Sequence, residues 1–244
     1  MHVDTDARVA QVRGLFAEAA RNGRVPLGVL DDHEEAALGE GRWALSDAAA
    51  WLAWTALPDE ERAAASGAAL RRLTDRGLAA VEDAGETFRV TPAAPAALVV
   101  AARSSPTYVV TVLPDDEPPA VLPYGYGLVD EVEGDRGLVV ELRGEGRHDY
   151  RLCSTAHAAE AFGTWAWQAV HEGVSGRRYG TVVLEVLRHR EGEPLQAAAV
   201  TVPGPDAGKD GMVQLFGGER ARRDAGDREA LVEQVAALLR QAGS

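Results

Sequence analysis

The second half of the chain is a succession of short apolar runs separated by turn residues. Runs rich in Val, Leu and Tyr recur from residue 108 onward, and turns such as GEGR and EGEP separate neighbouring runs. Strands joined by such short turns pair antiparallel, because a parallel pair needs a long crossover. A mainly antiparallel sheet is therefore expected, with strands at residues 108–113, 124–132, 138–143, 150–153, 179–188, 195–202 and 212–216.

Apolar residues spaced three and four apart predict helices that flank this sheet. Residues 155–171 place Ala158 and Phe162 on one side, and residues 227–241 place Leu231, Val235 and Leu238 on one stripe. Strands and helices do not alternate singly, so the predicted fold class is α+β. Strands followed by a helix occur twice, at residues 105–171 and 179–241, which indicates a quasi-two-fold arrangement.

The N-terminal part differs from this pattern. Residues 9–19 predict a helical arm, and residues 25–41, with Pro26, several glycines and an acidic run, are typical of a solvated connection or a short helix. We therefore expect an N-terminal helix and acidic connection over residues 1–41 and a single α+β domain over residues 42–244.

Residues 45–92 predict two successive helices followed by a hairpin, which is the order of a winged helix. The helices fall near 46–57 and 59–76, and the hairpin has strands at 78–81 and 87–91. DNA-binding winged helices are normally cationic. Here acidic and basic residues balance on the second helix, and the turn is acidic, so the segment is interpreted as a protein-packing module.

Charge and cysteine content exclude several classes of function. The net charge of −13 opposes broad binding to nucleic acid or anionic lipid. The most apolar stretch, residues 93–102, is far shorter than the roughly 20 residues of a membrane span. The single cysteine, Cys153, makes no internal disulfide. These features predict a cytoplasmic protein without membrane insertion.

No pattern in the sequence identifies a reaction. Cys153 is near His148 and His157 in sequence, but a free cysteine in a strand is typically a buried core residue. The spacing of histidines and acids matches no metal motif, and the glycine-rich segments lack the pattern of a phosphate loop. The sequence therefore predicts no catalytic residue, no metal site and no cofactor.

Aromatic residues are the candidate partner-binding residues. Trp165 and Trp167 are separated by about 200° on a helix, so both cannot face one core, and one is expected to meet a partner or another domain. Tyr124 and Tyr126 share one face of a strand, where they form either an exposed aromatic ledge or a cover for the sheet.

Residues 45–241 resemble the EspG family of actinobacterial type VII (ESX) secretion proteins. The resemblance rests on the segment LSDAAAWLAWTAL, on ALRRLTDRGLAAVEDAGETFRVTP and on the closing helix EALVEQVAALL. The residues that match the family's pattern, at the end of a helix and in the hairpin after it, are Leu73, Arg76, Gly77, Leu78, Gly85, Val90 and Pro92. The resemblance implies a quasi-two-fold sheet flanked by helices, no catalytic centre, and a cytosolic chaperone that keeps a helical secretion substrate soluble. Residues 1–41 have no counterpart in that family, and no binding residue is carried over from it.

The leading functional hypothesis is thus a non-enzymatic chaperone or adaptor that binds another protein. One alternative is a winged-helix transcriptional regulator built on residues 45–92. Another is an enzyme or small-ligand-binding protein with a pocket between sheet and helices. Residues that could converge in this pocket are Tyr124, Tyr126, Arg143, Arg151 and His148. Separately, pairing of edge strands between chains would allow a homodimer.

Overall fold

The structure is a computed structural model. It describes residues 5–39, 52, 54–83, 88–129, 136–144, 146–188, 194–206, 211–216, 218, 220–223 and 227–244. The helices are α1 (Thr5–Asn22), α2 (Asp32–Leu38), α4 (Asp59–Asp75), α5 (Ala94–Ser104), α6 (Thr155–His171) and α7 (Arg228–Gly243). The strands are β1 (Arg24–Asp31), β2 (Ala79–Asp83), β3 (Phe88–Pro92), β4 (Tyr108–Pro114), β5 (Val121–Val129), β6 (Arg136–Gly144), β7 (Arg147–Cys153), β8 (Thr181–Arg188), β9 (Gln196–Pro203), β10 (Gly211–Gln214) and β11 (Arg220–Arg223).

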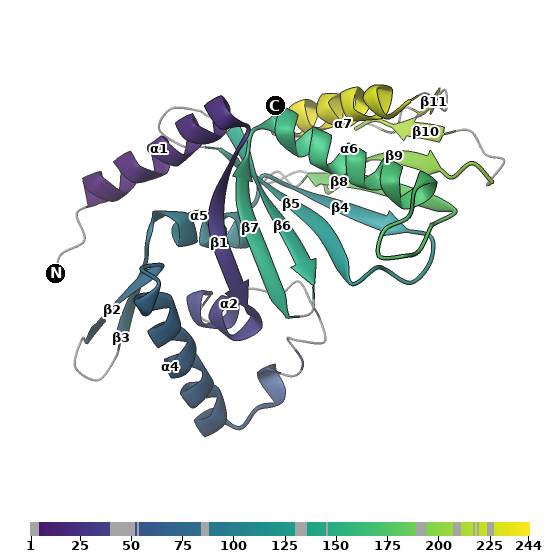
Figure 1. Cartoon of the computed structure of the whole chain (residues 1–244). Coiled ribbons are helices and arrows are strands. Elements are labelled where there is room, and N and C mark those ends of the chain that lie inside the picture. The colour runs from purple at the N-terminus through teal and green to yellow at the C-terminus, as the bar shows by residue number, and fades with distance from the viewer. Residues whose placement is uncertain are drawn as a thin grey trace.

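Nine of the described strands form one antiparallel sheet in the order β1-β7-β6-β5-β4-β8-β9-β10-β11 (Figure 1). The expected α+β class and antiparallel sheet are confirmed. Two units with the same connectivity build most of this sheet, because β4 to β7 lead into α6, and β8 to β11 lead into α7. The units meet where β4 pairs antiparallel with β8. This topology is that of a quasi-two-fold symmetric arrangement, with the symmetry axis passing between β4 and β8.

The two faces of the sheet are covered by different helices. Side chains alternate between the faces, so Leu138 and Val140 face α6 and α7, whereas Val139 faces α1 and α5. In Figure 1, α6 lies in front of the sheet and α5 lies behind it. We therefore call the side under α6 and α7 the front face, and the side under α1 and α5 the rear face.

The N-terminal part belongs to this sheet. Of the two expectations for residues 25–41, the short helix is present as α2, whereas the solvated connection is wrong for the described residues 25–39. β1 pairs with β7 along its length, and α2 follows it directly. Glu34 and Glu35 are 4% and 0% exposed, because arginines and a tyrosine from elsewhere in the chain meet them. An acidic run in the sequence was thus mistaken for a solvent-exposed one.

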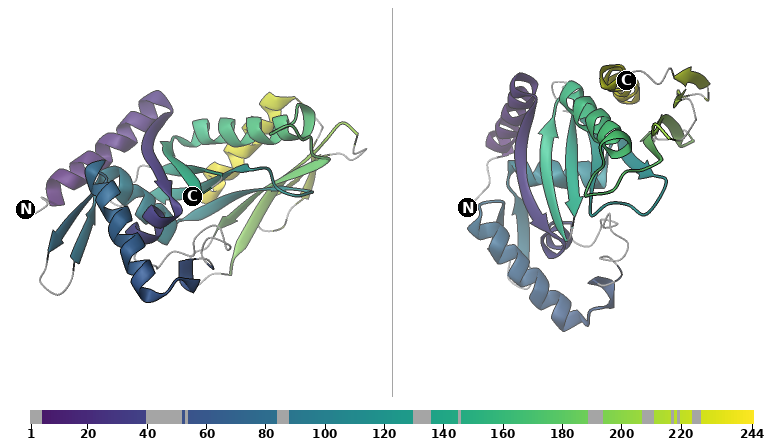
Figure 2. Two further views of the ribbon diagram at one scale, coloured as in Figure 1. Left: turned by 60° about the horizontal axis from the view of Figure 1, so that its bottom comes forward. Right: turned by 45° about the vertical axis from the view of Figure 1, so that its right-hand side comes forward.

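The winged-helix-like segment is present as α4 followed by the β2–β3 hairpin, which forms a separate two-stranded sheet. The predicted helix at 46–57 lies largely outside the described residues. Figure 2 shows α4 at the end of the molecule opposite to β10 and α7. Helix α5 was not predicted, and it packs the apolar residues 94–104 against the rear face. Among the described helices, none combines the length and apolar character that crossing a bilayer requires.

Candidate functional site

The most unusual side chains of the described residues meet between α2, α5 and the rear face of the first unit. Strands β5, β6 and β7 contribute Tyr126, Glu141, Arg143, His148 and Tyr150. Helix α2 contributes Asp32 and Glu35, and Arg103 comes from α5. We call these eight residues the charged cluster. Glu141 and His148 are 0% and 2% exposed, so this is an ionic site inside the protein.

A capping box forms the first turn of α2 and fixes the directions in which the carboxyl groups of this helix point. The side chain of Asp31 accepts a hydrogen bond from the Glu34 backbone N–H, and the Glu34 side chain accepts one from the Asp31 N–H. Because residues three apart share a helical face, Asp32 and Glu35 both reach the sheet. Glu34 points the other way, where it pairs with Arg72 of α4.

Glu141 is the centre of the cluster. Its Oε1 accepts hydrogen bonds from His148 Nδ1 at 2.7 Å and Arg143 Nε at 2.8 Å. Its Oε2 accepts from the Tyr126 hydroxyl at 2.7 Å and Arg103 Nη1 at 2.9 Å. Burial would raise the pKa of Glu141, but the hydrogen bond from His148 and the two guanidinium charges outweigh it and lower that pKa. Glu141 is therefore ionised.

His148 lies between two carboxylates. Its Nδ1 faces Glu141, and its Nε2 is 2.8 Å from Asp32 Oδ1. A carboxylate only accepts hydrogen bonds, and a neutral imidazole has one donor, so both contacts together require the imidazolium form. Burial lowers the pKa of His148, but the hydrogen bond to Glu141 and the carboxyl groups of Glu35 and Asp32 raise it above its ordinary value.

Glu35 is the least satisfied member of the cluster. Its Oε1 accepts a hydrogen bond from the Tyr150 hydroxyl, while its buried Oε2 has no partner. Arg103 Nη1 lies 3.7 Å from Oε1 and also donates to the Tyr150 oxygen at 3.0 Å. Burial raises the pKa of Glu35 despite the charge of Arg103. The cluster thus holds three carboxyl groups against three cationic groups, and Glu35 binds a proton more readily than an exposed glutamate.

The same residues include a possible set of metal ligands. One ligand atom each from Glu35, Glu141 and His148 lies within 4.8 Å of the others. However, the guanidinium group of Arg103 contacts Glu141 and lies near Glu35, and it already supplies the positive charge that an ion would bring. The donor set therefore does not fit a metal ion in this arrangement. The cluster instead joins α2 and α5 to the sheet.

The structure brings together four of the five residues expected in a pocket between sheet and helices. Tyr124 and Tyr126 share a strand face as predicted, and the guanidinium of Arg143 lies 3.9 Å from the centre of the Tyr124 ring. His148 joins them through Glu141. Arg151 does not, because it pairs with Asp149 away from the cluster. Tyr126 is 7% exposed, so it covers the sheet and is not part of an exposed ledge.

Sequence reasoning missed Glu35, Arg103, Glu141 and Tyr150. One signal for Glu141 was present, because an acid interrupts the apolar strand LVVELR. An acid in a strand that is buried on both faces requires cationic partners. No local pattern indicates that Arg103 and Tyr150 supply them.

Trp165 and Trp167 remain candidates for partner binding. Both are half-buried and pack against the front-face core from either side of the stripe that contains Phe162 and Ala166. Trp167 also stacks on His171, with ring centres 3.8 Å apart. The expectation that both cannot face one core is therefore wrong, because both contact the same core cluster, and their role in partner binding stays a prediction.

Cys153 is a buried strand residue, as interpreted from the sequence. It faces the front-face core, whereas His148 faces the rear, so the two do not form a catalytic pair. Burial raises the pKa of its thiol to about 11, which keeps it protonated and unreactive near neutral pH.

We expect His148→Gln to remove a pH-dependent part of the stability. Because the pKa of His148 is raised on folding, its contribution is fully present below about pH 6.5 and is lost as the pH rises through the folded value. The free energy of unfolding of the parent protein should therefore fall between about pH 6.5 and pH 9, and that of H148Q should fall less. Urea denaturation followed by tryptophan fluorescence measures this.

His157→Gln is the matched control, because His157 is partly exposed and its nearest carboxyl oxygen, on Glu160, is 3.9 Å away. Its pH profile should follow that of the parent protein. Identical slopes for the parent protein and H148Q would contradict the imidazolium assignment.

Comparisons with known proteins give no assignment. No protein-family model matches the sequence, and no curated protein is significantly similar to it.

Proposed function

We propose that this chain is a non-enzymatic chaperone or adaptor that holds a helical protein on the rear face of its second unit. The observation that carries this proposal is a contrast in burial between the two faces of the same strands. On the front face, Val182, Leu184 and Val186 of β8 are each at most 1% exposed. On the rear face, the alternating residues of β8 are all partly exposed.

The exposed surface crosses four strands, and we call it the open face. Leu113, Val183, Thr201 and Met212 are neighbours across β4, β8, β9 and β10. Leu113 and Met212 are 48% and 44% exposed. Glu185 and Ala199 form part of the adjacent row. The open face comprises Leu113, Val183, Glu185, Ala199, Thr201 and Met212.

The quasi-two-fold indicates what kind of element fits the open face. In the first unit, the corresponding rear surface of β5 and β6 is covered by the helix α5. The symmetry between the units relates β5 and β6 to β9 and β10. A sheet buries an apolar face against another layer, most simply a helix. A partner helix on β9 and β10 would therefore occupy the place that α5 occupies in the first unit.

Charge further defines this partner. Glu185 lies within the open face, and the described residues provide it with no hydrogen bond or ion pair. A partner helix with apolar residues around a central lysine or arginine would satisfy this carboxylate. An acidic protein of net charge −13 also favours a basic client.

The resemblance to EspG proteins points in the same direction. It implies a cytosolic chaperone whose client is a helical secretion substrate, and we extend that proposal to this chain. A client of this type would present the amphipathic helix that the open face requires.

The regulator alternative has less support. On α4, which would be the DNA-reading helix, Arg72 pairs with Asp31 and Glu34, and Arg76 pairs with Glu34. Arg62 pairs with Asp59 of the same helix. Cations that are neutralised within the protein contribute little to phosphate binding.

To test the proposal, the protein is co-expressed with its chromosomal neighbours, and the complex recovered at low salt is identified by mass spectrometry. We expect a helical protein at one-to-one stoichiometry. Leu113→Arg and Met212→Arg should each weaken its binding about thirtyfold or more, because a charge would be buried against an apolar helix. Glu185→Arg should weaken it by repelling the partner's cation.

Leu52→Arg is the control, because Leu52 is 66% exposed and lies outside the open face. Its complex should have the parent affinity. Binding that survives both open-face arginines would contradict the proposal. So would recovery of the protein alone, with DNA, or as a dimer of this chain.

A further inference from the structure

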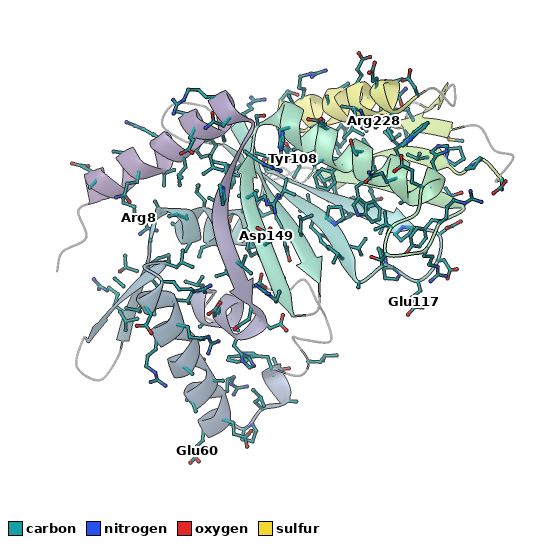
Figure 3. The ribbon with its side chains drawn as sticks, viewed as in Figure 1. Arg8, Glu60, Tyr108, Glu117, Asp149 and Arg228 are labelled. Carbon is teal, nitrogen blue, oxygen red and sulfur yellow. The ribbon has the colours of Figure 1, made fainter. Side chains whose placement is uncertain are left out.

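A second feature lies at the edge of the core, where α6 begins and α7 ends. A cavity of about 270 Å³ is lined there by residues of β4, β5, β6, α6 and α7. Tyr108, labelled in Figure 3, lies at this end of the sheet. The cavity is separate from the open face and from the charged cluster, so an inference about it goes beyond the proposed function.

One wall of the cavity is apolar. Leu128, Leu239 and the ring of Tyr108 line it, and Gly243 leaves the space beside them unfilled. A Cβ at Gly243 would lie 3.6 Å from Arg136 Nη1 and 3.7 Å from the Tyr108 ring. The position of the Tyr108 ring depends on Gly127, because any side chain there would collide with that ring.

Two hydroxyl groups of the cavity have no hydrogen-bond partner among the described residues. Tyr108 is 5% exposed, and the described residues give its hydroxyl no hydrogen bond. Thr107 Oγ1 is buried and has no partner either. A buried hydroxyl without a partner costs free energy, so Thr107 Oγ1 indicates a missing acceptor, and the Tyr108 hydroxyl is a second donor in the same cavity.

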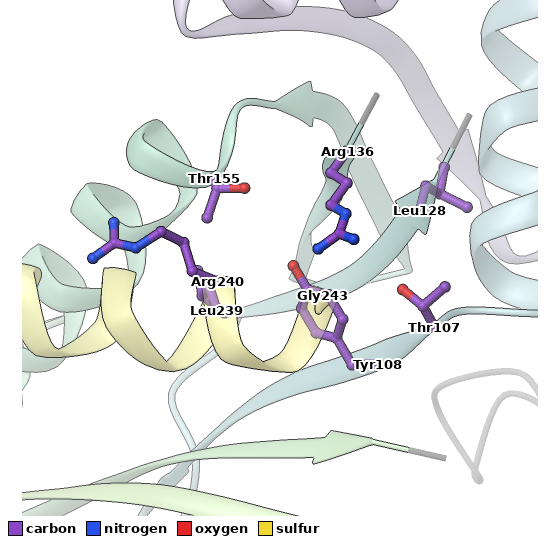
Figure 4. Close-up of a pocket in the computed structure, with 8 residues that line it drawn as sticks. All are labelled: Thr107, Tyr108, Leu128, Arg136, Thr155, Leu239, Arg240 and Gly243. Carbon is purple, nitrogen blue, oxygen red and sulfur yellow. The ribbon is translucent and has the colours of Figure 1, made fainter. Parts of the chain in front are cut away.

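Arg136 adds a positive charge to these donors. In Figure 4, its guanidinium group and the Tyr108 hydroxyl point into the same space, while the guanidinium of Arg240 points away from it. Within the described part of the chain, Arg136 has no carboxylate partner. Arg136 is itself exposed, and its guanidinium group adds a positive charge beside the two hydroxyl groups.

The N-terminus of α6 reaches the same cavity. Thr155 is the first residue of this helix and lines the cavity. The first turn of a helix carries unpaired N–H groups and a partial positive charge. Burial raises the pKa of Tyr108, so its hydroxyl stays protonated and can only help an acceptor by donating. All of these groups favour an anion.

We propose that this cavity binds a small organic carboxylate, with the carboxylate held by Arg136, Tyr108 and Thr107 and the apolar body packed on Leu128 and Leu239. An arginine fork matches the two oxygens of a carboxylate. The size of the cavity is at the lower end for small-molecule sites, which favours a compact ligand such as a benzoate or a short fatty acid.

Isothermal titration calorimetry with benzoate tests the proposal, with benzamide as its neutral analogue. Benzoate should bind once per chain. The affinity for benzamide should be lower than that for benzoate by about tenfold or more. Arg136→Gln should weaken benzoate binding about tenfold or more, and Tyr108→Phe several-fold, since it removes one donor but keeps the ring. Gly243→Leu should abolish binding by filling the cavity, provided that circular dichroism shows a folded protein.

Arg71→Gln is the matched control, because Arg71 is an exposed arginine on α4, distant from the cavity. It should leave the affinity for benzoate unchanged. The proposal is overturned by equal affinities for benzoate and benzamide, by unchanged binding in R136Q, or by no binding up to about 10 mM. Inorganic phosphate that binds as tightly as benzoate would overturn the role of the apolar wall.

Discussion

Replacing Arg103 with methionine is expected to lower the free energy of unfolding by about 3 to 5 kcal/mol. The Arg103 side chain is 3% exposed and contacts Glu141 and Tyr150, with Glu35 nearby. Methionine would fill most of the volume but leave two buried carboxyl groups without their shared cation. Urea denaturation at neutral pH, followed by circular dichroism and tryptophan fluorescence, measures the loss.

Two further variants show whether the loss is electrostatic. Arg71→Met removes an exposed arginine and should change the free energy of unfolding by less than about 0.5 kcal/mol. Adding Glu141→Gln to R103M should cost much less than Glu141→Gln costs alone, because the cation and the carboxylate depend on each other. A loss below about 1 kcal/mol in R103M, or additive losses in the double variant, would show that Arg103 does not hold the cluster together.

Local patterns were sufficient to predict most elements of the second half of the chain, although β11 was not predicted and β5 begins three residues earlier than expected. The apolar runs from residue 108 onward form strands, and their short turns give antiparallel neighbours, because both signals lie within a few residues. The two strand-and-helix units were also predicted. The alternation of buried and half-exposed residues in β8 follows directly from the two-residue period of a strand.

The charged cluster could not be predicted in the same way. Its contacts join residues far apart in sequence: Asp32 and His148 are separated by 116 positions, and Glu35 and Tyr150 by 115. The acidic run before Glu35 is typical of a solvent-exposed segment. Only the pairing of β1 with β7 places this run over the sheet. A sequence window contains the acids but not the arginines and tyrosine that make their burial tolerable.

The N-terminal part also explains why the two units differ. Helices α1, α2 and α5 cover the rear face of the first unit, where β1 extends the sheet, and the charged cluster attaches α2 and α5 there. None of the described residues plays the same part on the second unit, where Leu113 and Met212 stay exposed. The two similar units are therefore covered unequally by the described residues, and the second keeps the exposed surface on which the proposed partner would bind.

Replacing Phe162 with alanine is expected to lower the free energy of unfolding by about 3 to 5 kcal/mol. Phe162 is 0% exposed and lies in the middle of α6, between the sheet and α7. A Cβ on Gly125 of β5 would lie only 3.0 Å from its ring, so glycine lets the ring sit directly on the strand. Alanine would leave a cavity that neither the strand nor the helix can close.

Phe216→Ala is the control, because Phe216 is only half-buried at the edge of the same core. It should lose much less stability than F162A. Equal losses of unfolding free energy in both variants would mean that Phe162 contributes no more to the stability of the core than a half-buried residue at its edge.

The milder pair Phe162→Leu and His148→Gln tests whether both sides of the sheet unfold together. Phe162 packs on the front face and His148 on the rear, so their effects should add within about 0.5 kcal/mol, and each variant should unfold in a single transition. If H148Q instead produces a separate early transition, α1, β1, α2 and α5 fold as a unit of their own. These elements could then detach from the rear face of the first unit while the rest of the sheet stays folded.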